Sequence, residues 1–227
     1  MQWSNRRPFV PIALIDRVRM RRAALRYAAH GWAVTPGACL SGSRFACGRA
    51  GCPIMGCHPA IESWEDAAST DPARVTAWWR RRPHPVLLAT GWKFDVLEVP
   101  AGLGLRVLGA TRLHAGVHGP ERANARGPVA VTPAGRWMFL VRPGTPLRPE
   151  LARCLDVVRH GRDSWIPAAP SRMPDGQVRW AVPPERTQWS LPGSDTVQAM
   201  LVDALGTLGR RPAFSVPRQT STSRRAA

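Results

Sequence analysis

Apolar residues recur at helical spacing near the start of the chain. Between Asp16 and His30, Val18, Leu25 and the alanines at 24, 28 and 29 lie on one broad side, with arginines on the rest. Gly31 follows directly, and glycine commonly ends a helix. The pattern predicts an amphipathic helix over residues 16–30, whose basic side faces either solvent or an anionic partner.

A second helix is predicted to follow Ser69-Thr70-Asp71. These residues are good helix caps, Pro72 suits a first helical turn, and Pro83 must end the helix. Val75, Trp78 and Trp79 fall on one side, which predicts that the tryptophans pack in the core. Arg80, Arg81 and Arg82 then lie at the solvent-facing end.

Short apolar runs follow these helices. The runs Val86–Thr90 and Phe94–Val99 flank Gly91 and predict a buried, hairpin-like pair of strands. Residues 128–141 predict two strands that turn at Pro133-Ala134-Gly135. The remaining predicted elements are helices at 103–109, 147–158 and 195–208 and strands at 165–168 and 178–182.

This mixture of elements predicts one α/β (α+β) domain over residues 20–208, which includes a cysteine-rich loop at 37–59. Residues 1–19 form a basic lead-in. From 209 to 227 the chain carries arginines, Ser, Thr and Pro without apolar periodicity, which predicts a basic disordered tail.

The composition indicates a globular protein. Of 227 residues, 44% are hydrophobic and 21% are charged, close to globular averages. The apolar stretch from Pro8 to Ile15 is far shorter than the ~18 residues of a membrane span, and it lacks the cleavage site of a signal peptide. We therefore expect a cytoplasmic protein that does not associate with membranes.

The charge balance gives the first indication of a partner. Lys and Arg total 32 against 15 Asp and Glu, a net charge of +17, and Lys93 is the only lysine. Guanidinium groups pair with phosphate and stack on bases, so nucleic acid is the predicted partner. A coding bias would explain arginine in place of lysine, but not the excess of positive charge.

Four of the five cysteines gather in one glycine-rich loop. Cys39, Cys47, Cys52 and Cys57 lie within nineteen positions, and His58 follows. Sulfur and imidazole donors in one loop are typical of a structural zinc site. The spacing differs from a C-x2-C knuckle, so free thiols packed in a loop are the alternative.

The absence of two sequence motifs excludes two enzyme classes. The chain has neither the glycine-rich phosphate loop with its lysine nor the G-x-S-x-G turn of serine hydrolases. Asp95 and Glu98 lie in one predicted strand, but a separation of three sends their side chains to opposite faces of a regular strand. These two carboxylates therefore cannot share a metal ion there.

Seven segments resemble, in the same order, the N-terminal domain of bifunctional DNA primase/polymerases. The resemblance covers residues 20–183 and implies an archaeo-eukaryotic primase-type fold with an RRM-like sheet, in which two divalent metal ions assist the templated joining of nucleotides. The segments read ALRYAAHGWAVTPG, CGRAGCPIMGCHP, WEDAASTDP with AWWRRRP, LLATG, FDVLEVP, TPAGRWMFLV and WIPAAPSRMPDGQVRW.

The same resemblance implies that the catalytic positions are altered. The family's Asp-x-Asp pair, which holds Mg²⁺ or Mn²⁺, corresponds to Glu98 and Pro100, and proline offers no ligand oxygen. The histidine that contacts the incoming triphosphate corresponds to Trp137. The third acidic position falls near Val158, with Asp156 two residues away. Loss of one metal ligand should cost ~10³-fold or more in rate.

The family's zinc element is matched in part. Cys47, Cys52 and His58 correspond to its ligands, but Phe45 occupies the first cysteine position. The resemblance therefore implies zinc held by Cys47, Cys52 and His58, with Cys39 as the fourth ligand and Cys57 as the alternative.

The leading functional hypothesis is a primase/polymerase-type domain that has lost catalysis. It would act by binding nucleic acid, DNA rather than RNA, or a replication-type protein. Trp137 would stack on a base, with core packing as the alternative role of this side chain. The residues expected on phosphate are Arg80, Arg81, Arg82, Arg136 and Arg172.

Two other hypotheses stay open. In the first, the chain is an active nucleotidyltransferase whose Mg²⁺ or Mn²⁺ ions are held by Glu98, Asp95 and Asp156, which requires a bulge that turns Asp95 inward. In the second, the chain is a protein-interaction remnant, and the net charge of +17 serves only solubility.

Overall fold

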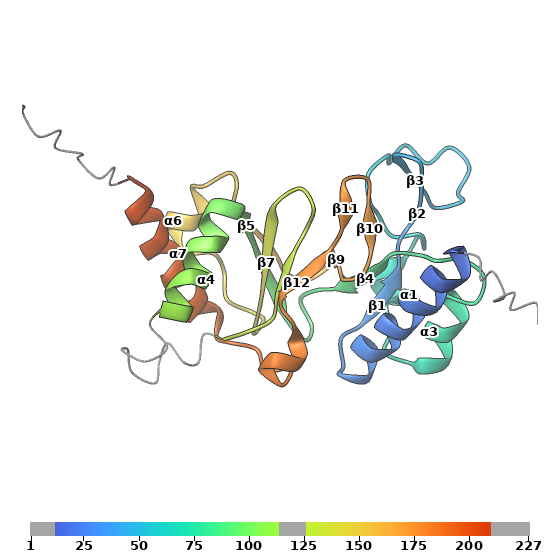
Figure 1. The fold of residues 1–227 in the computed structure, drawn as a ribbon, viewed down its shortest axis with the longest axis horizontal. Coiled ribbons are helices and arrows are strands. Elements are labelled where there is room, and N and C mark those ends of the chain that lie inside the picture. The colour runs from blue at the N-terminus through green and yellow to red at the C-terminus, as the bar shows by residue number, and fades with distance from the viewer. Residues whose placement is uncertain (1–11, 114–125, 210–227) are drawn as a thin grey trace, which may run out of the picture.

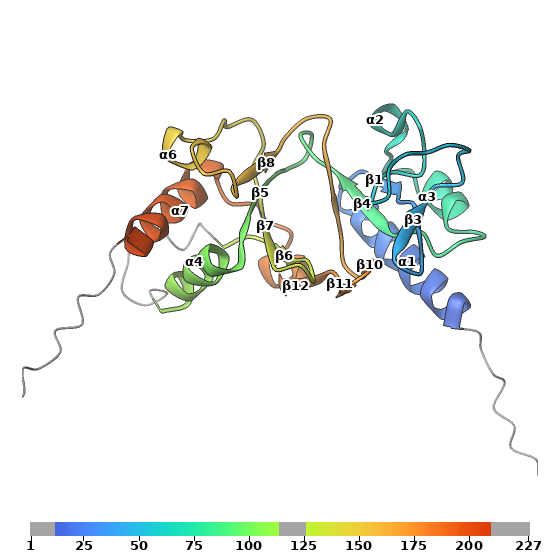
Figure 2. The ribbon, with the colours of Figure 1, turned by 90° about the horizontal axis from the view of Figure 1, so that it is seen from above.

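A computed structural model describes residues 12–113 and 126–209, which form two lobes that lie side by side (Figures 1 and 2). Each lobe is built around an antiparallel sheet. The predicted tail beyond Gly209, and residues 1–11 of the predicted lead-in, lie outside the described residues. No described helix has both the length and the apolar character needed to cross a bilayer.

The first lobe contains a three-stranded sheet in the order β1-β4-β9. Helix α1 packs against α3 and against the first two of these strands. A hairpin, β2–β3, and a short ribbon, β10–β11, extend from the lobe. The elements are α1 (Ile12–Ala29), β1 (Val34–Pro36), β2 (Cys39–Ser41), β3 (Arg44–Ala46), α2 (Trp64–Ala67), α3 (Pro72–Trp78), β4 (Val86–Ala89), β9 (Trp165–Pro167), β10 (Arg172–Met173) and β11 (Gly176–Gln177).

The second lobe contains a five-stranded sheet in the order β12-β6-β7-β5-β8. Helices α4 and α7 pack together, and both contact β7. The elements are β5 (Asp95–Pro100), α4 (Ala101–Leu113), β6 (Val129–Val131), β7 (Arg136–Val141), α6 (Pro149–Ala152), β8 (Val158–His160), β12 (Arg179–Val182), a 3-10 turn (Pro184–Thr187) and α7 (Ser194–Gly209).

The buried apolar residues form two hydrophobic cores. The first joins the lobes, because Trp32 and Val86 from the first lobe belong to the same buried cluster as Val96, Met138 and Leu140 from the five-stranded sheet. The second lies on the other face of that sheet, beneath the helices of the second lobe. Each face of the five-stranded sheet is therefore covered.

Several predicted elements are confirmed, as is the mixed α/β class. The first helix ends before Gly31, whose φ of 77° requires glycine's freedom, and it begins at Ile12, inside the range assigned to the lead-in. Asp71 caps α3 by accepting hydrogen bonds from the backbone N–H groups of Ala73 and Arg74.

The predicted hairpin between residues 86–90 and 94–99 is wrong. β4 pairs with β1 and β9, whereas β5 pairs with β7 and β8. The turn at Gly91 carries the chain out of one lobe and into the other, so the two apolar runs contribute to different sheets.

The predicted helix over residues 147–158 is also wrong. Only Pro149–Ala152 is helical, and the segment ends in β8, which forms the edge of the five-stranded sheet beside β5. Leu151 and Val157 are buried in the second core on either side of this break. Backbone pairing with β5 thus outweighs the helical spacing of the apolar side chains.

Candidate functional site

Glu98 lies on β5, on the sheet face that turns toward the first lobe. The register of β5 with β7 is regular from Asp95 to Pro100, so Glu98 shares a face with Val96, which is buried between the lobes. The Glu98 side chain is 20% exposed. It therefore lies at the border between the buried core and solvent.

Both oxygens of Glu98 are engaged. Arg136 donates from Nε to Oε1 at 2.7 Å, and His160 Nε2 lies 2.9 Å from Oε2. Arg136 also donates from Nη2 to the backbone oxygen of Asp156 at 2.7 Å, and His160 Nδ1 lies 3.0 Å from Ser164 Oγ. We call Glu98, Arg136 and His160 the Glu98 cluster.

This environment keeps Glu98 ionised. Burial has the largest influence and raises the pKa of Glu98, but the hydrogen bonds with His160 and Arg136, together with the electrostatic influence of both side chains, outweigh it. The net result is a pKa below the usual value for glutamate. The negative charge of Glu98 is therefore present at neutral pH and is balanced within the cluster.

The three positions that the resemblance assigns to metal ligands do come together. Val158 on β8 lies directly opposite Glu98, and Pro100 lies two residues further along β5 on the same face. Glu98 supplies the one carboxylate of these three. Asp156 is exposed, and its backbone oxygen, not its carboxylate, contacts the cluster.

Asp95 lies on the opposite face, as the separation of three predicts. It is 1% exposed, and its Oδ2 accepts hydrogen bonds from Arg159 Nη2 at 2.7 Å, Arg159 Nε at 3.1 Å and Gly144 N at 3.0 Å. Its Oδ1 is buried and has no hydrogen-bond partner among the residues that the structure describes. The described part of β5 has no bulge that would turn Asp95 toward Glu98.

Trp137 is placed in the second core. It is 8% exposed and packs so closely on α4 that a Cβ at Gly104 would overlap its ring. Its neighbour Arg136 points to the other face, toward Glu98. This placement is the core packing that the sequence left open as the alternative to base stacking.

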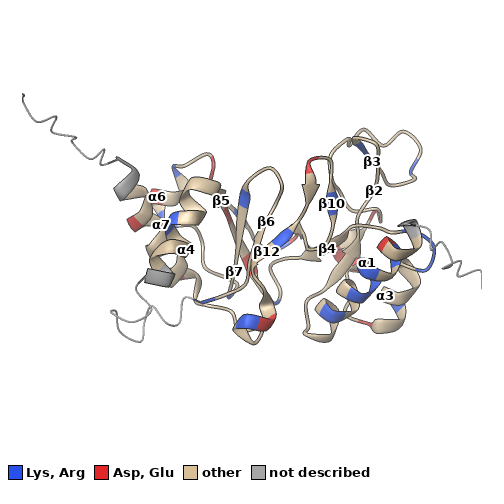
Figure 3. Cartoon of the chain, viewed as in Figure 1, with Lys and Arg blue, Asp and Glu red and all other residues tan. Residues whose placement is uncertain are grey.

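The predicted phosphate-binding arginines differ in their availability. Arg80–Arg82 follow α3 and are exposed, whereas Arg136 is held by Glu98. Arg172 on β10 is 57% exposed and makes one long contact of 3.9 Å to Asp16. Basic positions also recur along α1 (Figure 3).

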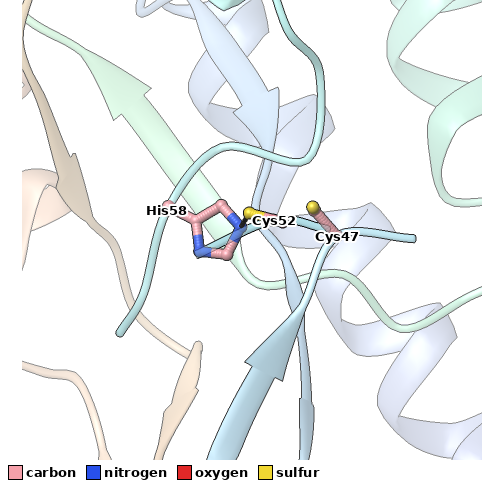
Figure 4. A group of neighbouring side chains, drawn as sticks. All are labelled: Cys47, Cys52 and His58. Carbon is pink, nitrogen blue, oxygen red and sulfur yellow. Dashed lines mark hydrogen bonds between the residues drawn. The ribbon is translucent and has the colours of Figure 1, made fainter. Parts of the chain in front are cut away.

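The cysteine loop brings three of its predicted ligands together (Figure 4). The donor atoms of Cys47, Cys52 and His58 lie within 4.8 Å of one another, and no other such group of acidic, Cys or His side chains is found among residues 12–113 and 126–209. His58 is buried, and its Nδ1 donates to the Gly56 oxygen at 2.8 Å, which leaves Nε2 for another partner. This group could hold a metal ion.

Two further features make the group a good set of ligands. Cys52 Sγ lies 3.6 Å from His58 Nε2. Arg49 Nε lies 3.5 Å from Cys47 Sγ, and this hydrogen bond, followed by that of His58, lowers the pKa of the Cys47 thiol to about 6. A thiol with a lowered pKa is a thiolate at neutral pH, the form that binds metals.

The other cysteines of the loop do not join this group. Cys39 lies opposite Ala46 in the β2–β3 hairpin, and its Sγ is 3.3 Å from His84 Nδ1. Because Cys47 follows Ala46, strand alternation explains why the side chains of Cys39 and Cys47 diverge. Burial raises the pKa of Cys57 to about 12, and Phe45 is 7% exposed in the hairpin.

Sequence reasoning missed two residues. His160 was outside every predicted element, and its contact with Glu98 depends on the pairing of β8 with β5. Trp92 follows Gly91 between two apolar runs, and it is 63% exposed, with Arg162 Cζ 3.9 Å from the centre of its ring. A tryptophan in a turn that joins two buried strands was the signal that could have found it.

Comparison with curated proteins gives no match. A family model does match: the one described as bifunctional DNA primase/polymerase, N-terminal, covers residues 24–193. That range contains every strand of both sheets, the cysteine loop and the Glu98 cluster. With more than half of its length matched, the chain belongs to the Prim-Pol family of bifunctional DNA primase/polymerase N-terminal domains.

Proposed function

We propose that this Prim-Pol domain binds nucleic acid and does not join nucleotides. The observation that carries the proposal is which residues occupy the three metal-ligand positions. They hold Glu98, Pro100 and Val158, so one carboxylate stands where the family uses three.

The partners of Glu98 support the loss of metal-dependent chemistry. Two-metal catalysis requires carboxylates whose charge is free to bind the ions and to neutralise the transferred phosphoryl group. Glu98 instead forms an ion pair with Arg136 at 2.7 Å and a second contact with His160 at 2.9 Å. A divalent cation would have to displace Arg136, and it would then meet a proline and a valine.

The charge distribution supports binding. The chain carries a net charge of +17, and Arg80–Arg82 are exposed at the end of α3. Arg172 is half-exposed, and its contact with Asp16 is long enough to contribute little. These side chains are free to contact phosphate oxygens, and we expect DNA to be preferred over RNA.

The proposal is tested by measuring binding and primer synthesis on the same protein. We expect no template-dependent product with Mg²⁺ or Mn²⁺, and a DNA affinity that falls steeply as salt rises, because counterions are released from each contacted phosphate. Substitution of Arg80, Arg81 and Arg82 together by Ala should reduce the salt slope of duplex binding by about 2 to 3. Fluorescence anisotropy across a salt series measures this slope.

A matched variant separates specific contacts from net charge. Replacement of Arg106, Arg126 and Arg153 by Ala removes the same charge from exposed positions of the second lobe and should leave the slope nearly unchanged. A template-dependent product that disappears in Glu98→Ala would establish the active-enzyme alternative. Absence of DNA binding at low salt would favour the protein-interaction alternative.

We also propose that the metal of the cysteine loop is a structural zinc ion held by Cys47, Cys52 and His58. Zinc bonds of ~2.3 Å to sulfur and ~2.1 Å to nitrogen at a tetrahedral angle place these donors about 3.6 Å apart. Cys52 Sγ and His58 Nε2 are separated by 3.6 Å. Bound zinc would cross-link the loop that follows β3 to the segment that leads into α2.

Zinc content provides the measurement. We expect one zinc per chain by elemental analysis, a lower melting temperature after chelation, and loss of both the metal and the chelator effect in Cys52→Ser. Cys154→Ser is the control, because Cys154 lies in the second lobe, where its Sγ donates to the Glu150 oxygen at 3.5 Å, outside the cysteine loop. Equal zinc contents in Cys52→Ser and the unsubstituted protein would contradict the assignment.

A further inference from the structure

Trp92 differs from every other tryptophan in the described residues because its side chain is largely in solvent. It is 63% exposed, whereas the others in residues 12–113 and 126–209 are buried or partly buried. Tryptophan is highly buried on average in folded proteins, and it is among the side chains on which single-stranded bases stack. Its position in the fold therefore calls for a functional explanation.

The loop that carries Trp92 is held firmly. Gly91 N donates to the Phe94 oxygen at 2.8 Å, which closes a tight turn around Trp92. Thr90 N donates to the Ser164 oxygen at 2.9 Å, and Thr90 Oγ1 donates to the Gly161 oxygen at 2.5 Å. The indole ring thus stands on backbone that is fixed before any ligand arrives, which lowers the entropic cost of binding.

Arg162 covers one face of the ring. Its Cζ lies 3.9 Å from the ring centre, a cation–π geometry, and the loop bonds that hold Thr90 also fix the segment that bears Arg162. Lys93 is exposed next to Trp92, and Asp163 is the exposed acid beside Arg162. An aromatic face with two adjoining cations matches an anionic polymer that carries flat bases.

The pair lies on the two segments by which the chain crosses between the lobes, and Figure 2 shows the elements that these segments join. Residues 90–94 lead from β4 to β5, and residues 161–164 lead from β8 back to β9. Ser164 also contacts His160 of the Glu98 cluster at 3.0 Å. A strand that reaches Trp92 would therefore run along the junction of the lobes, next to the face where the family places its catalytic residues.

We propose that Trp92 and Arg162 form a stacking platform for one base of a single-stranded nucleic acid. This inference rests on the proposed nucleic-acid binding and specifies its form. The free face of the Trp92 ring stacks on the base, and Arg162 holds the ring while its guanidinium contacts a phosphate. A duplex offers no exposed base face along its length, so this platform selects single strands.

The test compares binding of a 20-nucleotide oligo(dT) and of a duplex of the same length by fluorescence anisotropy. Trp92→Ala should raise the Kd for the single strand about tenfold, with the salt slope unchanged and duplex affinity within about twofold. Trp92→Phe, which keeps a flat ring, should restore most of the affinity. Leu155→Ala is the control, because Leu155 is 98% exposed in the second lobe.

Photo-cross-linking gives an independent readout. An oligonucleotide with 5-iodouracil should form an adduct that mass spectrometry maps to Trp92. If the unsubstituted protein binds oligo(dT), but Trp92→Ala binds it equally well and the adduct lies elsewhere, the platform is wrong while the proposed function stands. If the unsubstituted protein binds neither DNA, the proposed function itself fails. An equal loss of single-strand and duplex affinity in Trp92→Ala would also overturn the platform.

Discussion

Replacement of Gly91 by alanine should lower the free energy of unfolding by about 2 to 5 kcal/mol. Gly91 has a φ of 88°, where a non-glycine residue costs about 1 to 2 kcal/mol. A Cβ there would also overlap the backbone of Arg162, and relief of such overpacking costs about 1 to 3 kcal/mol. Urea denaturation followed by circular dichroism measures the change.

Gly42→Ala is the matched control for this prediction. Gly42 also has a positive φ, 61°, but a Cβ at this position meets no atom of the described residues within 4 Å. It should therefore show the backbone cost alone, about 1 to 2 kcal/mol. Equal losses in the two variants would mean that contact between the two segments joining the lobes does not restrict residue 91.

Replacement of Arg159 by alanine should destabilise the protein by about 3 kcal/mol. Arg159 is the cation that neutralises Asp95, which is 1% exposed and has one oxygen without a hydrogen bond to any described residue. Removal of one partner of a buried ion pair leaves the other charge unpaired in a medium of low polarity. Urea denaturation of the single variant at neutral pH measures the loss.

A double variant distinguishes two causes of this loss of stability, an unpaired buried charge and lost packing of the Arg159 side chain. Asp95→Asn removes the charge but keeps an oxygen that can accept from Gly144 N, the third bond to this side chain. In the Arg159→Ala background it should recover about 1 to 2 kcal/mol, because the uncompensated carboxylate is gone. If the double variant is less stable than Arg159→Ala alone, Arg159 acts mainly through packing.

Local structural features could be predicted from the sequence. Asp71 and Pro72 predicted the start of α3, and Asp71 does cap it, because capping depends on residues two or three positions apart. The opposite faces of Asp95 and Glu98 followed from strand alternation in the same way. The correspondence of Glu98 and Pro100 to the metal pair came from the order of seven segments, a pattern that does not depend on side-chain contacts.

The sequence could not predict which strands pair with one another. Gly91 predicted a turn, but a turn that closes a hairpin and one that sends the chain into another sheet carry the same local signal. The position of Cys39 could not be predicted for a related reason: Cys39 lies near the other cysteines in sequence, but in the β2–β3 hairpin its Sγ lies near His84. His160 meets Glu98 across 62 residues, which only the sheet pairing determines.

The strand order of the first lobe has a consequence for biosynthesis. Its sheet is completed by β9, residues 165–167, which follow four of the five strands of the second lobe's sheet in the chain. A nascent polypeptide on the ribosome must therefore carry β4 with an unpaired edge until translation has passed Pro167. Truncated products that stop before this point would expose that edge to aggregation, so neither lobe is a unit that can be made by cutting the gene in two.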